Sequence, residues 1–121
     1  DDFRSIVGLM TASEHVVFAT PVYWYAMSAI MKTFFDRFTD LLNDQQDRMT
    51  GRALAGRKIW LIATGTDADM PPGFTEPFSR TAEYFGMEWR GAAYCRSIKG
   101  APLSAESLEP ARQLADEIDC S

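Results

Sequence analysis

The sequence predicts an α/β fold, a three-layer sandwich in which a parallel sheet carries helices on both faces. Three apolar runs of strand length, at residues 15–20, 58–64 and 87–94, alternate with segments of helical periodicity. The middle run is apolar throughout, as expected of a parallel strand that is covered on both sides. The order helix, strand, helix, strand, helix, strand, helix is typical of parallel α/β sheets. A length of 121 residues fits one domain spanning residues 1–121.

The first half of the chain is predicted to contain two helices around one strand. Phe3, Val7 and Met10 recur at helical spacing, with two acidic residues at the helix start. The strand at 15–20 follows, and a helix is predicted over residues 28–42. Its apolar face is broad and consists of Ile30, Met31, Phe34, Phe35, Phe38, Leu41 and Leu42. The polar side carries Lys32, Asp36, Arg37 and Asp40, which we interpret as structural or subunit-contact residues.

The second half repeats the alternation after a polar connection, residues 43–57. The strand at 58–64 ends in a loop rich in glycine and proline, which leads to a helix predicted over residues 74–85. Gly86 ends that helix and the third strand follows. The last predicted helix, 104–118, starts at a serine cap.

Charge and cysteine content limit the possible functions. A formal net charge of −5 argues against nucleic acid, whose phosphates would be repelled. Cys95 and Cys120 are far apart and fit neither a metal site nor a disulfide, which indicates a reducing compartment and hence a cytoplasmic protein. Cys95 is expected to be a small buried hydrophobic residue, and Cys120 to lie in a mobile tail. No apolar run approaches about 18 residues, so membrane insertion is not expected.

Few side chains suit acid–base or metal chemistry. His15, the only histidine, precedes the first strand at the amino edge of the sheet, where we expect it to be solvated. Asp67 and Asp69 form a pair without a third ligand, so no metal site is predicted. No serine or cysteine has a recognisable base beside it, and we predict no catalytic side chain.

The most informative segment is the loop between the first strand and the next helix. Pro21 stops the strand, and three consecutive aromatic residues follow, Tyr23, Trp24 and Tyr25. Open α/β sheets bind ligands beyond the carboxyl ends of their strands, so this loop is a candidate ligand crevice. Aromatic loop residues also occur in protein interfaces. The alternative for Tyr25 is that its ring contacts a partner subunit instead of a ligand.

The block from Thr20 to Arg37 resembles the second flavin-contacting loop of the flavodoxin-like NAD(P)H:FMN and NAD(P)H:quinone reductases. That pattern, Thr/Ser-Pro-x-Tyr and then Lys-x-Phe-x-Asp-Arg, is carried by Thr20, Pro21, Tyr23, Lys32, Phe34 or Phe35, Asp36 and Arg37. The resemblance implies a flavodoxin-like fold, FMN as cofactor, NAD(P)H as hydride donor and a small-molecule electron acceptor. It implies that the ring is lined by Pro21, Val22, Tyr23, Trp24, Tyr25 and Met27, and by Thr64, Gly65, Thr66 and Asp67 after the second strand. The alternative for the loop at residues 64–67 is that it is an ordinary strand-to-helix connection and contacts no ligand.

The resemblance also predicts missing parts. A flavodoxin-like domain has five parallel strands, whereas this sequence accounts for three, the C-terminal three-fifths of the fold. The first strand, the phosphate loop and the second strand, on the order of 50 residues, would lie before Asp1. Without those elements we expect the subunit to associate with copies of itself, as a dimer or tetramer.

Two other functions remain open from the sequence. A flavin-free remnant of the fold could act as an interaction or oligomerisation module through the aromatic loop and the long helix. A receiver-type signalling domain is the weaker alternative, because the strand ends lack its acidic cluster and phosphorylatable aspartate.

Overall fold

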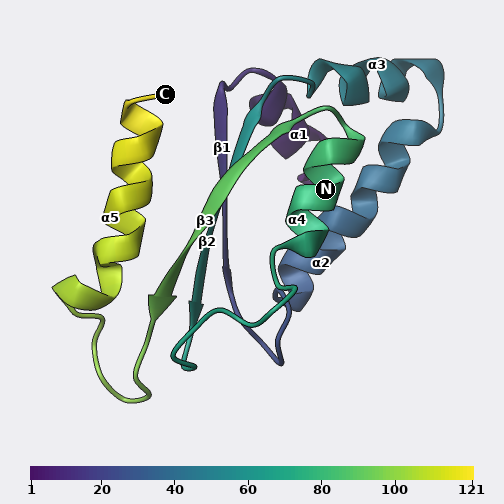
Figure 1. The fold of residues 1–121 in the computed structure, drawn as a ribbon. Helices are drawn as coiled ribbons and strands as arrows, with labels where there is room; N and C mark the ends of the chain where they lie inside the picture. The colour runs from purple at the N-terminus through teal and green to yellow at the C-terminus, as the bar shows by residue number, and fades with distance from the viewer.

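A computed structural model describes all residues, 1–121, and shows a three-stranded parallel sheet in the order β1-β2-β3 (Figure 1). This arrangement confirms the predicted α/β fold. The elements in chain order are α1 (Phe3–Thr11), β1 (His15–Pro21), α2 (Ala29–Asp36), the 3₁₀ helix η1 (Arg37–Leu42), α3 (Gln45–Ala53), β2 (Lys58–Gly65), α4 (Glu76–Tyr84), β3 (Glu88–Arg96) and α5 (Ala105–Asp119).

Helices cover both faces of the sheet, unequally. α5 lies alone on one side, and α1 to α4 lie on the other (Figure 1). The strand registers pair Pro21 with Thr64 and Gly65 with Arg96, so the three strands end nearly level. The loops that follow β1 and β2 therefore lie at the same carboxyl edge, where the candidate site was predicted.

The larger core lies between the sheet and α1 to α4. Phe18 of β1 is at its centre, with ring centroids 5.1 Å from Phe35 and 6.1 Å from Phe78. On the other face, Trp60 packs with Ala93 and Leu114 under α5. Both sides of β2 are thus buried, which explains why its sequence is apolar without alternation.

The predicted long helix at 28–42 is in fact two helices. α2 ends at Asp36, and η1 continues as a 3₁₀ helix in which Phe38 and Leu41 are buried. Residues three apart lie on the same side of a 3₁₀ helix, so the tighter winding turns both side chains into the core.

The polar connection predicted at 43–57 contains a helix, α3, that was not expected. Asp44 caps it by accepting a hydrogen bond from the backbone N–H of Asp47 at 2.8 Å. The Asp47 carboxylate is buried and accepts two hydrogen bonds from Arg4 of α1, which holds its pKa below the ordinary value. Tertiary contacts thus stabilise this helix, and they cannot be predicted from the helix propensity of its residues.

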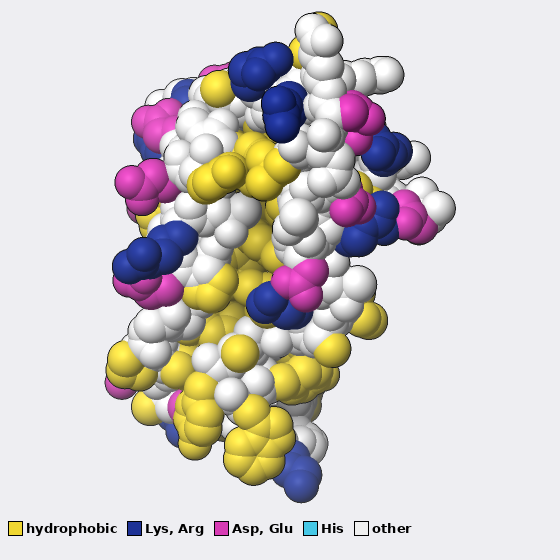
Figure 2. Space-filling model, turned by 90° about the vertical axis from the view of Figure 1, so that its right-hand side faces the viewer, with side chains coloured by type: hydrophobic (Ala, Val, Ile, Leu, Met, Phe, Trp, Pro, Cys, Tyr) yellow, Lys and Arg dark blue, Asp and Glu magenta, His cyan; other side chains and the backbone are white.

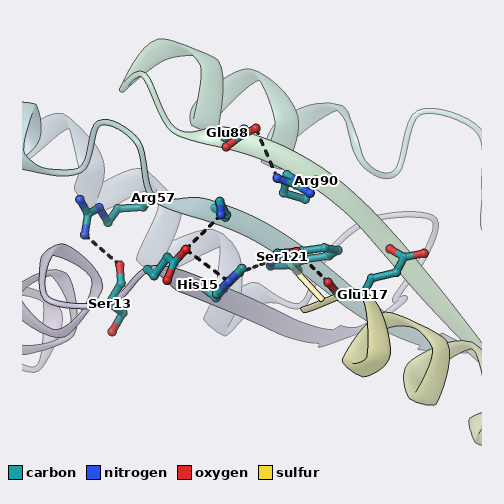
Figure 3. Close-up of polar contacts among 10 residues, drawn as sticks. Ser13, His15, Arg57, Glu88, Arg90, Glu117 and Ser121 are labelled. Atoms are coloured by element: carbon teal, nitrogen blue, oxygen red, sulfur yellow. Dashed lines mark hydrogen bonds and ion pairs between the residues drawn. The ribbon is translucent and has the colours of Figure 1, made fainter. Parts of the chain in front are cut away.

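His15 lies at the amino edge of the sheet, as predicted, but the expectation that it is solvated was wrong. Its side chain is only 18% exposed, and its Nδ1 accepts a hydrogen bond of 3.0 Å from the indole N–H of Trp60 (Figure 3). A buried tryptophan needs an acceptor for its N–H, and the side chain of His15 supplies one. In the same region Arg57 donates to the carbonyl oxygen of Ser13 at 3.2 Å (Figure 3).

Both cysteines are free thiols. Cys95 is buried, as predicted, whereas Cys120 is exposed at the C-terminal cap of α5 and so belongs to the end of a helix. None of the helices combines the length and hydrophobicity that crossing a lipid bilayer would require.

Candidate functional site

The aromatic loop after β1 forms a tight turn with a strained backbone. Tyr23 and Ala26 exchange two backbone hydrogen bonds, of 2.9 and 3.1 Å. Between them, Trp24 and Tyr25 have φ angles of 50° and 71°, which makes this a type I′ turn. Glycine and asparagine normally occupy such positions, because a β-carbon there costs about 1–2 kcal/mol per residue. The turn leaves Trp24 and Tyr25 91% and 66% exposed. Strained backbone of this kind occurs often at functional sites.

Hydrogen bonds hold both ends of this turn. The N–H of Val22 donates to the carbonyl oxygen of Thr64 at 2.7 Å, which ties the loop to the end of β2. The buried hydroxyl of Thr20 accepts from the N–H of Ser28 at 3.0 Å and donates to the carbonyl oxygen of Pro21 at 2.9 Å. Ser28 in turn caps α2 by accepting from the N–H of Met31 at 3.2 Å. The strained turn is therefore fixed in place at the sheet edge.

The loop after β2 is held by residues of β3 and the segment that follows it. The N–H of Ser97 donates to the carbonyl oxygen of Gly65 at 2.7 Å, and the hydroxyl of Tyr94 donates to the carbonyl oxygen of Asp67 at 2.9 Å. Burial, and secondarily the charge of Asp67, raises the pKa of Tyr94 above its ordinary value, so this hydroxyl keeps its proton.

The two loops enclose a cavity of about 160 Å³ at the carboxyl edge of the sheet. It is lined by Val22, Trp24, Tyr25, Gly65, Thr66, Asp67 and Tyr94. The first six of these residues were predicted from the sequence, and the structure brings them together from two loops.

The other predicted site residues lie outside the cavity wall. Met27 is buried in the core, and Tyr23 is exposed at the base of the turn. Pro21 ends β1, and Thr64 contributes the carbonyl oxygen that accepts from Val22. These residues support the turn and the sheet edge without lining the cavity.

Tyr94 is a wall residue that the sequence reasoning missed. It pairs with Ala63 across β2 and β3, close to the carboxyl ends of both strands. Its place near the end of a predicted strand was the available signal, but the third strand was interpreted only as part of the sheet.

The two loops around the cavity contain unpaired backbone donors and exposed aromatic rings. The N–H groups of Trp24, Tyr25, Thr66 and Asp67 donate no hydrogen bond within the chain. Unpaired amides beside exposed indole and phenol rings suit a planar conjugated ligand with hydrogen-bond acceptors along its edge. The residues of the wall include one carboxylic acid, Asp67, and one phenol, Tyr94. Lys32 and Asp36 pair with each other on α2, as their spacing predicted.

Comparisons with known proteins identify the fold family. The family model for the flavodoxin-like fold matches residues 3–118. A curated relative from Bacillus subtilis (strain 168) bears the name "Putative NAD(P)H-dependent FMN-containing oxidoreductase YwqN" and is 29% identical over 93 residues. The match covers 75% of this chain and 51% of the relative, so the chain spans about half the length of that protein.

Solved structures share the fold at low sequence identity. The Trp repressor binding protein from Bacillus subtilis superposes with a TM-score of 0.81 and 24% identity, over 93% of this chain and 75% of that one. General stress protein 14 from Treponema denticola, solved in complex with FMN, has a TM-score of 0.68 and 22% identity. The match covers 99% of this chain and 73% of that one. An NADPH-quinone reductase from P. pentosaceus has a TM-score of 0.69 and 16% identity, over 96% of this chain and 71% of that one.

Proposed function

The chain belongs to the flavodoxin-like fold family, and from that membership we propose that it binds FMN and serves in NAD(P)H-dependent reduction of a flavin or quinone. The observation that carries the proposal is the cavity between the strained turn and the loop after β2, with unpaired amides and aromatic rings in its wall. The name of the curated relative supports the same cofactor pair, and one structural neighbour was solved with FMN.

Four of the wall residues would contact the flavin in this proposal. The rings of Trp24 and Tyr25 would flank the isoalloxazine, and the N–H groups of Thr66 and Asp67 would donate to its edge. Bound FMN would supply the hydride chemistry. Preorganised amides at that edge would favour the reduced ring, on which negative charge develops.

The remaining predicted residues would act through these contacts. Val22 and Thr64 join the two loops by a backbone hydrogen bond, and Gly65 leaves room for the ring of Tyr94. Pro21 ends β1, Tyr23 closes the turn by pairing with Ala26, and Met27 lies in the core after the turn. Because the side chain of Trp24 is almost fully exposed, one side of the cavity is open to NAD(P)H and to the acceptor.

Three further proposals accompany this function. We propose that residues 1–121 act as one domain, that the chain associates with copies of itself, and that it works in the cytoplasm. The free, unpaired state of Cys95 and Cys120 supports the last of these.

A titration of the purified chain with FMN, followed by quenching of flavin fluorescence, tests the proposal. We expect saturable quenching that Trp24→Ala weakens at least tenfold, since base- or ring-stacking on an aromatic side chain contributes about 1–3 kcal/mol. Leu9→Ala is the control, because Leu9 is also an exposed apolar residue, 68% accessible on α1. Absence of quenching at high FMN would contradict the reductase proposal and favour a flavin-free interaction module.

A further inference from the structure

Trp60 of β2 is the largest side chain in the small core under α5. It is 1% exposed and packs with Ala93 of β3 and Leu114 of α5, and Ile118 of α5 packs against the same cluster. The helices on the opposite side of the sheet enclose the larger core and leave a strip of hydrophobic side chains between charged ones (Figure 2). Because α5 is alone on its side, its position on the sheet depends on few contacts, and Trp60 supplies the largest of them.

The indole N–H of Trp60 donates to a side chain that can itself take up a proton. Nδ1 of His15 accepts this hydrogen bond at 3.0 Å, and the centroids of the two rings are 6.0 Å apart (Figure 3). A neutral imidazole whose Nδ1 accepts must carry its proton on Nε2, so a second proton can bind only at Nδ1. Protonation of His15 would therefore convert the acceptor into a donor that points at the indole N–H.

The charged neighbours of His15 do not take over this role. Oε1 of Glu14 lies 3.9 Å from Nε2 of His15, the ring nitrogen that does not bond to the indole. Glu14 also accepts a hydrogen bond of 3.0 Å from Lys58, which holds the pKa of Glu14 below its ordinary value and keeps this carboxylate charged. The indole N–H donates to none of the carboxylates. The other charged groups around the pair are Arg57 ahead of β2, Glu88 and Arg90 of β3, and Glu117 of α5 (Figure 3).

A protonated His15 would leave Trp60 without an acceptor and beside a second cation. The guanidinium carbon of Arg90 already lies 5.5 Å from the centre of the indole ring. A buried N–H that loses its acceptor is left without water as well, which makes the loss more costly than that of an exposed hydrogen bond. The indole can regain a partner only by turning toward water, and that movement breaks its contact with Leu114.

We propose that His15 is a proton-operated switch for the docking of α5, in which the neutral imidazole holds Trp60 and α5 in place and the protonated imidazole releases them. Histidine is the side chain that ordinarily changes its charge between about pH 5 and 8, and His15 is the only histidine in the chain. Near the other end of α5, Ser107 lines a hollow of about 310 Å³ together with Tyr94, so the switch links the amino edge of the sheet to its carboxyl edge. The inference does not depend on FMN binding.

Hydrogen exchange followed by NMR at about pH 8 and about pH 5 tests the switch. The readouts are the protection factors of the indole N–H of Trp60 and of the backbone N–H groups of Leu114 and Ile118, each relative to the intrinsic exchange rate at the same pH. We expect all three to fall by about fivefold or more at the lower pH, because a buried donor loses its acceptor. The backbone N–H of Val7, in α1 on the opposite side of the sheet, should keep its protection.

Two variants separate the imidazole from all other titrating groups. His15→Asn offers an acceptor that takes up no proton in this range, so the protection of Trp60 and α5 should be the same at both pH values. His15→Phe keeps a flat ring without an acceptor, and protection should be reduced already at the higher pH. Unchanged protection in the unmodified chain, an equal pH-dependent loss in His15→Asn, full protection of His15→Phe at the higher pH, or a loss shared by Val7 would each overturn the proposal.

Discussion

The ring of Tyr94 occupies the space that a side chain at Gly65 would need. A β-carbon built on Gly65 would lie 2.6 Å from the hydroxyl oxygen of Tyr94, closer than real β-carbons come to any atom. The tyrosine of β3 can therefore reach across the end of β2 and donate to the carbonyl oxygen of Asp67 only because position 65 is a glycine. This pair of residues sets the shape of the loop that carries two of the unpaired amides.

Gly65→Ala should displace the ring of Tyr94 and with it the loop at 66–67. We expect a loss of about 1–3 kcal/mol in the free energy of unfolding, since overpacking of this kind forces side chains and backbone to shift. FMN affinity should fall at least tenfold. Urea denaturation and flavin quenching measure the two effects. Gly8→Ala is the matched control, because a β-carbon there meets nothing within 4 Å and α1 should gain up to about 1 kcal/mol.

Tyr94→Phe removes the hydrogen bond to Asp67 and keeps the ring. We expect a loss of about 0.5–1.5 kcal/mol in stability and a reduction of FMN affinity of a few-fold. The pKa of Tyr94 is raised in the folded state, so above pH 10.0 the unfolded chain ionises first. The stabilisation by this tyrosine is thus complete below pH 10.0 and is lost as pH rises through the folded pKa. Denaturation curves across alkaline pH, compared with those of the variant, should show this difference; parallel curves would contradict it.

The strained turn predicts a trade between stability and binding. Trp24→Gly and Tyr25→Gly relieve the left-handed backbone and remove one exposed ring each. We expect each variant to be as stable as the unmodified chain or more stable, by about 1 kcal/mol. FMN affinity should fall at least tenfold for Trp24→Gly. Thermal unfolding and flavin titration on the same samples measure both quantities, and a clear loss of stability would refute the claim that the turn is strained.

The pair of Arg4 and Asp47 predicts how the chain responds to acid. The folded-state pKa of Asp47 lies below 3.8, with the hydrogen bond from Arg4 as the main cause. The pair therefore stabilises the fold above pH 3.8 and ceases to do so as pH falls through the lower folded pKa. Arg4→Met should be less stable than the unmodified chain at neutral pH, and the difference should shrink below pH 3.8. Arg112→Met is the control, since Arg112 belongs to no ion pair and its loss should cause no such pH dependence.

The local sequence pattern was sufficient to predict the segments in which one kind of interaction dominates. β2 could be identified because both of its faces are buried, and α5 because Ser104 caps it and accepts from the N–H of Ser107 at 3.1 Å. The aromatic loop after β1 could be located because a proline and three rings follow a strand at a known edge of such sheets. In these segments, neighbouring residues determine the structure.

The missed features depend on residues far apart in the sequence. α3 has little apolar surface and is held by Arg4, which is 43 positions before Asp47. Tyr94 joins the site through a contact 27 positions away, and His15 is held by Trp60, 45 positions away. The left-handed backbone at Trp24 and Tyr25 was also not predictable, because those residue types disfavour it and only the surrounding hydrogen bonds impose it.

The most direct test of the central claim is a ¹H–¹⁵N correlation spectrum of the chain recorded during titration with FMN. A flavin site at the sheet edge predicts that the amide signals of Trp24, Tyr25, Thr66 and Asp67 shift most and reach saturation together, while those of Leu42 in η1 and Tyr84 in α4 stay in place. Unchanged spectra at high FMN, or shifts confined to the region of Leu42 and Tyr84, would contradict a flavin site at the carboxyl edge of the sheet.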